Sequence, residues 1–211
     1  MKINIIIPSY NNQESLSILI QRIVDFYDEQ IIVIDDGSEI PLILNDMQNV
    51  AILRNDRNSG KGYSLMKGFQ YSLDQGFTHS ITLDSDLQHD PVHIKEFIGM
   101  DEKYDMVIGK RKFSEAMPIS RRFSNSITTK IISFLTGCKI LDSQSGYRRY
   151  SLDVYKDMNF SELGFQFESE IIIKYARSNA KISYVNISTI YSNESSSQRI
   201  ISDTFKFIRM I

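Results

Sequence analysis

Two aspartates separated by one residue, Asp84 and Asp86, are the strongest chemical signal in the sequence. They follow a short apolar run, Ile81–Leu83, which predicts that both carboxylates stand at the end of a buried strand. Paired carboxylates in that position can bind a hard divalent cation and leave coordination sites for phosphate oxygens, and Gln88 can add a neutral oxygen ligand. The alternative is a pair of surface or helix-capping aspartates.

A second acidic segment, Asp35-Asp36-Gly37-Ser38, follows another apolar run. Asp, Gly and Ser favour turns, so the segment is compatible with a turn that leads into a helix cap. The other interpretation is that one of the two aspartates hydrogen-bonds the base or the ribose of a nucleotide. The residue types alone leave both interpretations open.

Gly60-Lys61-Gly62 precedes an amphipathic segment and is therefore expected to open a helix. Backbone N–H groups at such a position can bind phosphate. The segment is not a P-loop, because Asn55 stands where the first glycine is required and Gly62 where Ser or Thr is required. It is not a dinucleotide-binding fingerprint either, because Leu65 takes the place of the third glycine. A flexible turn is the alternative.

Positive charge is concentrated between residues 110 and 130. This stretch contains six basic residues and one acidic residue, Glu115, so its net charge is +5 in a protein of net charge −2. A solvated helix face would explain it, and so would a site for an anionic group, because arginine can bind phosphate through two hydrogen bonds. A surface that contacts membrane phospholipid is a third interpretation. The six residues are Lys110, Arg111, Lys112, Arg121, Arg122 and Lys130.

Two histidines, His89 and His93, lie four residues apart and close to Asp86, a spacing that would suit metal ligands. Pro91 lies between them, so a continuous helix that presents both side chains is not expected. The sequence shows no local grouping of serine, histidine and aspartate, or of cysteine and histidine, for nucleophilic catalysis.

Alternating strands and helices are predicted for the first half of the chain. Short apolar runs rich in Ile and Val indicate buried strands, and the longer segments between them place apolar residues on one helical face. Such alternation favours a parallel sheet covered by helices on both faces, with ligands beyond the carboxyl ends of the strands. The predicted strands are Ile3–Ile7, Ile31–Ile34, Val50–Leu53, Ile81–Leu83 and Met106–Ile108, and the predicted helices are Ser15–Tyr27, Ser64–Leu73 and His93–Met100.

The pattern is less regular after residue 110. No internal repeat or linker divides the chain, so we expect the second half to complete the same domain and to build the second wall of a cleft. Helices are predicted over Ile119–Leu135 and Phe167–Ala176, strands over Gly146–Tyr150 and Lys181–Ile190, and the start of a helix over Thr204–Ile211.

Composition excludes several classes of protein. Because 24 Lys and Arg residues are balanced by 26 Asp and Glu residues, nucleic acid is not an expected partner. The longest uninterrupted apolar runs have four residues, far short of the ~20 that span a bilayer. One cysteine, Cys138, excludes an internal disulfide and a cysteine-based zinc site. We expect a cytoplasmic protein, since the N-terminus does not resemble a signal peptide.

Six segments in a fixed order resemble glycosyltransferase family 2, the inverting nucleotide-sugar transferases. The similarity is greatest to the dolichyl- and polyprenyl-phosphate sugar synthases. It implies a single α/β domain over residues 1–211 with a GT-A, Rossmann-like fold, in which a mixed, mainly parallel sheet is flanked by helices. The segments are Ile7–Asn11, Ile34–Ser38, Asn58–Gly62, Asp84–Pro91, Asp142–Arg148 and Phe165–Glu168.

The resemblance implies that residues 1–110 bind the nucleotide-sugar donor, a UDP-sugar or a GDP-sugar. In relatives, the residues that match Pro8, Tyr10 and Asp36 hold the nucleoside, and those that match Asp35 and Lys61 lie nearby. The expected nucleotide-binding side chains are therefore these five together with Asp84.

The resemblance also implies that Asp84, Asp86 and Gln88 bind Mg²⁺ or Mn²⁺ on the donor diphosphate. A divalent cation there would neutralise the charge that develops on the leaving nucleoside diphosphate. Inversion implies one in-line displacement at the anomeric carbon of the sugar. Asp86 is accordingly expected among the catalytic residues.

Residues 111–211 are expected to bind the acceptor. If the acceptor is a polyprenyl phosphate, its nucleophile is already an anion and needs no general base. Four arginines are candidates to hold that phosphate, and the enzyme would then serve envelope glycan synthesis at the inner face of the cell membrane. They are Arg111, Arg121, Arg122 and Arg148.

If the acceptor is a sugar hydroxyl of a polysaccharide or lipopolysaccharide, a base must remove its proton. Glu168, Glu170 and Asp142 are the candidates for that base. The basic stretch and the Asp-Leu-Gln-His sequence favour the lipid phosphate. A nucleotidyltransferase is disfavoured because Pro8–Gln13 contains neither Gly nor Arg, and a non-catalytic binding module is disfavoured by the intact acidic motif.

Overall fold

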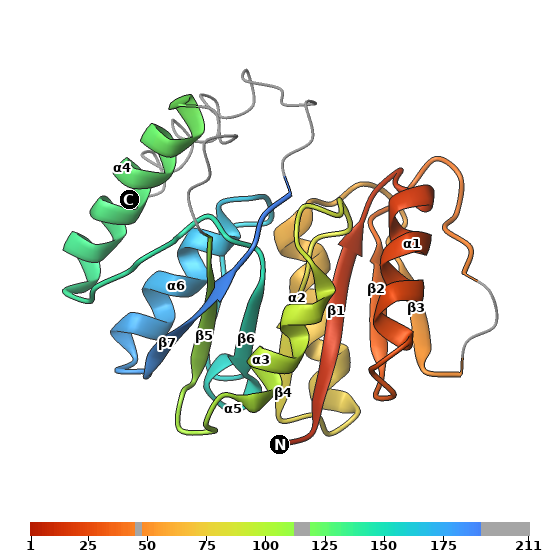
Figure 1. The fold of residues 1–211 in the computed structure, drawn as a ribbon, viewed down its shortest axis with the longest axis horizontal. Helices are drawn as coiled ribbons and strands as arrows, with labels where there is room; N and C mark the ends of the chain where they lie inside the picture. The colour runs from red at the N-terminus through yellow and green to blue at the C-terminus, as the bar shows by residue number, and fades with distance from the viewer. Residues whose placement is uncertain (45–47, 112–118, 191–211) are drawn as a thin grey trace.

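The computed structural model describes residues 1–44, 48–111 and 119–190, without the side chains of 119–124. In these ranges, seven strands form one sheet at the centre of the protein (Figure 1). The strand order is β3-β2-β1-β4-β6-β5-β7. The strands are β1 (Ile3–Ser9), β2 (Ile31–Asp35), β3 (Val50–Arg54), β4 (His79–Thr82), β5 (Met106–Arg111), β6 (Arg148–Ser151) and β7 (Ile182–Ile187).

The sheet is mixed because one strand runs against the others. β1 pairs in parallel with β2 and β4, β2 pairs in parallel with β3, and β5 pairs in parallel with β7. β6 lies antiparallel between β4 and β5. The start of β6 therefore meets the carboxyl ends of the parallel strands, and the loop that precedes it, residues 142–147, reaches the edge where ligands bind.

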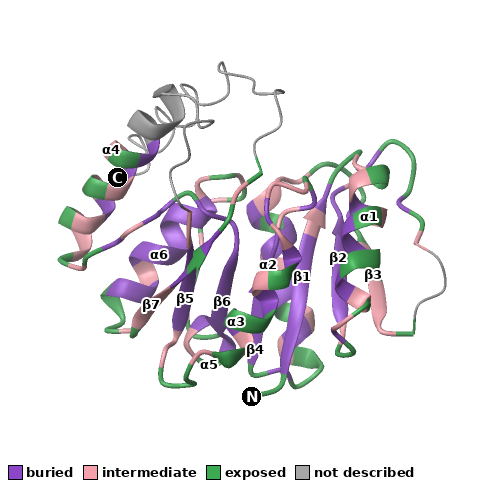
Figure 2. Cartoon of the chain, in the orientation of Figure 1, coloured by how far each residue is buried: buried purple, intermediate pink, exposed green. Residues whose placement is uncertain are grey.

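Helices cover both faces of the sheet. One apolar cluster joins alternate residues of β1, such as Ile5 and Ile7, to α1 and α3, and a second joins Ile6 to α2, α4, α5 and α6. Figure 2 shows the buried residues along the central strands and the helix faces that meet them. The helices are α1 (Gln13–Val24), α2 (Lys61–Asp74), α3 (Ile94–Gly99), α4 (Ile119–Thr136), α5 (Leu152–Tyr155) and α6 (Phe167–Arg177).

The predicted elements that fall within the described residues are present, with differences in detail. Val50–Arg54 is a half-exposed edge strand rather than a buried one, because among the described strands it pairs with β2 alone. The helix expected over residues 93–100 is a 3-10 turn at Pro91–His93 followed by α3. The antiparallel direction of β6 was not predicted from the residues. The helix expected over residues 204–211 lies outside the described part of the chain.

None of the helices in the described ranges is long and apolar enough to cross a membrane.

Candidate functional site

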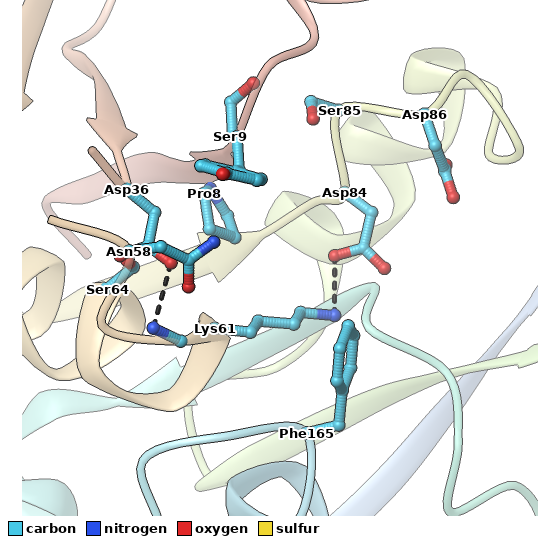
Figure 3. Close-up of a pocket in the computed structure, with 12 residues that line it drawn as sticks. Pro8, Ser9, Asp36, Asn58, Lys61, Ser64, Asp84, Ser85, Asp86 and Phe165 are labelled. Atoms are coloured by element: carbon cyan, nitrogen blue, oxygen red, sulfur yellow. Dashed lines mark hydrogen bonds and ion pairs between the residues drawn. The ribbon is translucent and has the colours of Figure 1, made fainter. Parts of the chain in front are cut away.

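A cleft of about 480 Å³ lies at the carboxyl ends of β1, β2 and β4. Figure 3 shows its side chains converging from these strand ends and from the start of α2. Six residues predicted for nucleotide or metal binding line it: Pro8, Tyr10, Asp36, Lys61, Asp84 and Asp86. The rule that ligands bind beyond the carboxyl ends of parallel strands thus locates the candidate site in this fold.

Asp36 fixes the loop that leads into α2. Its carboxylate accepts hydrogen bonds from the backbone N–H groups of Ser59 and Gly60, both at 2.9 Å, and from Asn55 Nδ2 at 2.8 Å. Its side chain belongs to the cleft lining although the residue is only 5% exposed. Asp36 therefore shapes the floor of the cleft by ordering the loop before Lys61, and it is not a helix cap.

Asp35 is not among the residues that line the cleft, although a position near the nucleotide was expected for it. Its carboxylate forms an ion pair with Arg54 and accepts hydrogen bonds from the N–H groups of Ser38, at 2.9 Å, and Leu42, at 3.3 Å. Burial raises the pKa of Asp35, but these hydrogen bonds outweigh burial and hold the pKa below its usual value. The alternation of side chains along β2 explains why only one of the adjacent aspartates reaches the cleft.

Lys61 joins two carboxylates from different elements, Asp84 just after β4 and Glu168 at the start of α6. Its Nζ lies 2.7 Å from Asp84 Oδ1 and 3.1 Å from Glu168 Oε1, and its side chain is 12% exposed. Burial lowers the pKa of Lys61, but the two carboxylates outweigh burial and raise it. The Phe165 ring lies 5.8 Å from the ammonium. Lys61 is thus a buried, charged link between the strand end of β4 and the start of α6.

Asp86 is exposed on the cleft, two residues beyond Asp84. Although the residue is accessible to solvent, partial desolvation of its carboxyl group within the cleft and the nearby Asp84 charge both raise the pKa of Asp86. Its Oδ1 accepts the Gln88 N–H at 3.0 Å, and Leu87 between them has a φ of 59°. The backbone of Gln88 is thus next to the acidic pair, while its side chain is not part of the cleft lining.

The acidic pair suits a hard divalent cation, because both carboxylates open onto one cleft and supply oxygen ligands. In the described ranges no three His, Cys, Asp or Glu side chains gather around one point. This donor set fits a cation that takes its other ligands from a bound molecule, such as a diphosphate, rather than a site built from protein side chains alone.

The other two carboxylates expected as general bases are engaged elsewhere. Asp142 forms a bidentate ion pair with Arg111, which lowers the pKa of this buried carboxyl although burial opposes the change. Glu170 accepts hydrogen bonds from the N–H groups of Ser161, at 3.1 Å, and Glu162, at 2.9 Å. Glu170 therefore anchors the loop before α6, and Asp142 anchors the loop before β6.

Arg148 is fully buried, which contradicts its expected contact with an acceptor phosphate. Its guanidinium donates to the carbonyl oxygens of Ser145 at 2.6 Å, Glu168 at 2.7 Å and Ser143 at 2.9 Å. These bonds tie the loop before β6 to the start of α6. The side chains of Arg121 and Arg122, at the start of α4, lie outside the described residues.

The histidines do not form a pair of metal ligands. His89 is buried, and burial lowers its pKa to about 4. His93 Nδ1 lies 2.7 Å from Glu96 Oε1, and its Nε2 accepts the Ser188 N–H at 3.1 Å. His93 thus links the turn after β4 to the end of β7.

Several residues that line the cleft were not assigned from the sequence as site residues, among them Ser64 and Phe165. Ser64 lies one helical turn after Lys61, so its spacing could have revealed it. Phe165 lies in the loop before α6 and begins one of the six segments that resemble the family, but no periodic pattern predicts that a loop residue lies near a distant strand end.

Comparison with known proteins gives the family. Residues 4–158 match Glycosyl transferase family 2. A UDP-N-acetylglucosamine–dolichyl-phosphate N-acetylglucosaminyltransferase of Methanococcus voltae is 26% identical, over 92% of this chain and 87% of that protein. An undecaprenyl-phosphate mannosyltransferase of Micrococcus luteus is 24% identical, over 90% of this chain and 84% of that protein.

A solved structure shares the fold. Glucosyl-3-phosphoglycerate synthase from Mycobacterium tuberculosis, in complex with Mn²⁺, UDP and glucosyl-3-phosphoglycerate, superposes with a TM-score of 0.74 at 16% identity. The match covers 98% of this chain and 77% of that one. The fold is therefore the GT-A fold expected from the resemblance, and the chain belongs to glycosyl transferase family 2.

Proposed function

We propose that this protein transfers a sugar from a UDP- or GDP-sugar to a polyprenyl phosphate, with inversion at the anomeric carbon. The observation that carries the proposal is the cleft in which Asp36, Lys61, Asp84 and Asp86 meet at the carboxyl ends of three parallel strands. Membership of the family and the lipid-phosphate transferases among the relatives support it.

The donor occupies this cleft in the proposal. Pro8 and Tyr10 provide apolar surface for the base, and the loop ordered by Asp36 bounds the nucleoside. Lys61 provides a buried positive charge beside the diphosphate. Asp84 and Asp86 would hold Mg²⁺ or Mn²⁺, which supplies charge neutralisation for the departing nucleoside diphosphate.

The engagement of the carboxylates favours a phosphate acceptor over a hydroxyl. Glu168 pairs with Lys61, Asp142 with Arg111, and Glu170 with backbone N–H groups. A hydroxyl acceptor needs a carboxylate that can take up a proton, whereas a phosphate monoester is already an anion near neutral pH. Residues 111–211, including the basic stretch, form the acceptor side in this proposal.

Calorimetric titration with UDP and GDP, each with and without Mn²⁺, tests the donor site. We expect metal-dependent binding of one nucleotide by the wild type and its loss in Asp86→Ala. Asp56→Ala, an exposed aspartate in the loop before α2, is the matched control and should bind as the wild type does. Metal-independent binding, or equal binding by Asp86→Ala, would contradict the assignment of the acidic pair.

Transfer of a radiolabelled sugar tests the acceptor. Undecaprenyl phosphate in detergent should accept the sugar, whereas undecaprenol, which has a hydroxyl in place of the phosphate, should not. The anomeric configuration of the product, measured by NMR, tests inversion. Transfer to a glycan hydroxyl with no transfer to the lipid phosphate would favour polysaccharide or lipopolysaccharide assembly instead.

A further inference from the structure

The Lys61 ammonium lies next to Asp84, a carboxylate that the proposed function assigns to the divalent cation. Its ammonium is 2.7 Å from Asp84 Oδ1 and 3.1 Å from Glu168 Oε1, and the side chains of all three residues are largely buried. Figure 3 shows the lysine extending along the cleft to Asp84, with the Phe165 ring beside its tip. Asp84 therefore already has a positive partner within the chain.

We infer that Lys61 and the divalent cation compete for Asp84, and that Glu168 is the second anchor to which the Lys61 ammonium moves when the cation binds. The inference rests on the proposed donor site and describes how the binding of the cation and of the donor diphosphate is coupled there. The protein alone binds the cation weakly, and the donor diphosphate and the cation each raise the affinity for the other.

The electrostatics of the cleft carry this argument. A divalent cation beside Asp84 would face an ammonium at close range in a buried site, where like charges repel far more than they do in water. Glu168 allows the ammonium to stay paired while it leaves Asp84. A diphosphate adds negative charge that both cations can share, so it removes the conflict. Because coupling between two ligands is reciprocal, the cation raises diphosphate affinity by the same factor.

Packing around Asp84 limits how far the Lys61 ammonium could move away from a divalent cation bound there. A Cβ built on Gly146 would lie 2.6 Å from Asp84 Oδ2 and 2.9 Å from Lys61 Nζ, so the backbone of the loop before β6 closes this side. The ammonium is thereby confined between Asp84, Glu168 and the Phe165 ring.

Titration of Mn²⁺ alone, followed by calorimetry or by the electron paramagnetic resonance of free Mn²⁺, tests the inference without any transfer activity. We expect Lys61→Gln, which keeps a hydrogen-bond donor, to bind Mn²⁺ about tenfold more tightly than the wild type, a change typical of coupled sites. Glu168→Gln should bind it more weakly, because the ammonium loses its second anchor. Lys67→Gln removes the same charge from the same helix and should change little, since Lys67 contacts Arg54 and Asn55 instead.

The same titrations in the presence of UDP or GDP measure the coupling. The nucleotide should raise the Mn²⁺ affinity of the wild type more than that of Lys61→Gln. Equal Mn²⁺ affinity of wild type and Lys61→Gln, with metal-dependent nucleotide binding intact, overturns the competition and leaves the proposed function standing. Absence of metal-dependent nucleotide binding in the wild type overturns both. Circular dichroism establishes that each variant is folded, and Lys61→Met repeats the test if the glutamine variant is not.

Discussion

Arg111 and Asp142 form a bidentate ion pair that joins the end of β5 to the loop before β6. Arg111 Nε lies 2.8 Å from Asp142 Oδ2, and Nη2 lies 2.9 Å from Oδ1. The Asp142 side chain is 2% exposed. Two residues that the sequence analysis assigned to the acceptor, one as a phosphate ligand and one as a base, are thus partners of each other. Together they fix the loop that carries Gly146 to the cleft.

Replacement of Asp142 by asparagine should destabilise the protein. Removing one member of a buried ion pair leaves an uncompensated charge, which typically costs about 3 kcal/mol. Urea denaturation of wild type and Asp142→Asn would measure the loss in the free energy of unfolding. Asp153→Asn, which breaks an exposed ion pair with Lys156, is the control and should cost far less. A loss of activity in Asp142→Asn at unchanged stability would instead favour a role as a base.

The same pair should contribute to the pH dependence of stability. The pKa of Asp142 is lowered in the folded protein, because Arg111 outweighs the opposite effect of burial. A carboxyl with a depressed pKa stabilises fully above its unfolded pKa of about 4 and loses this contribution as the pH falls through the folded value. The difference in unfolding free energy between wild type and Asp142→Asn should therefore be constant near neutrality and shrink below about pH 4. An increase of the difference in acid would contradict the ion pair.

Asp36→Asn should weaken both the fold and nucleotide binding. Asp36 accepts three hydrogen bonds through its two carboxylate oxygens. In asparagine an NH₂ group, which is a donor, replaces one of these oxygens, so a backbone N–H loses its acceptor. Loss of a charged hydrogen bond of this kind costs about 2 kcal/mol. Thermal unfolding and nucleotide titration would measure the two effects. Asp56→Asn, at an exposed position in the loop that Asp36 orders, should alter neither. Unchanged nucleotide affinity in Asp36→Asn would show that the ordered loop is dispensable for binding.

The first half of the fold could be predicted because its signals are local. Short apolar runs, none longer than four uninterrupted residues, end at polar segments, and the parallel arrangement brings those ends together. This logic placed Pro8, Tyr10, Lys61 and the acidic pair at one edge, and in the structure they line one cleft. Their roles in binding stay predictions.

The second half could not be predicted in the same way, because its contacts are distant in sequence. Nothing in the residues of β6 indicates that the strand runs antiparallel, yet this direction brings the preceding loop to the cleft. The sequence does not tell whether an arginine is exposed or buried, and Arg148 is buried, with its guanidinium hydrogen-bonded to backbone carbonyl oxygens. The pairing of Arg111 with Asp142 spans 31 residues and has no local signal.

Arg148→Met should lower stability and leave acceptor recognition unchanged. The methionine removes donors from three carbonyl oxygens in a buried region, those of Ser143, Ser145 and Glu168. We expect a loss of about 3 kcal/mol or more in the free energy of unfolding. The control is Arg57→Met, at an exposed position. If Arg148→Met retained wild-type stability and raised only the KM for the acceptor, the buried role would be wrong.

Gly146→Ala should disturb the acidic site by a small steric change. The new Cβ would lie 2.6 Å from Asp84 Oδ2 and 2.9 Å from Lys61 Nζ, so the carboxylate and the ammonium must shift. Overpacking of this kind costs about 1–3 kcal/mol. Because the displaced atoms belong to the proposed cation and diphosphate sites, metal-dependent nucleotide affinity should fall by about tenfold, the equivalent of 1.4 kcal/mol. Nucleotide titration with and without Mn²⁺ would measure this change.

Gly99→Ala is the matched control for this steric argument, because in the described residues no atom outside its chain neighbours and its own helix backbone lies within 4 Å of the Cβ it would introduce. It should leave both stability and nucleotide affinity close to those of the wild type. A fall in stability without a change in metal-dependent affinity in Gly146→Ala would mean that Asp84 and Lys61 can shift together without loss of the site. An equal fall of nucleotide affinity with and without Mn²⁺ would instead attribute the effect to Lys61 rather than to the cation ligands.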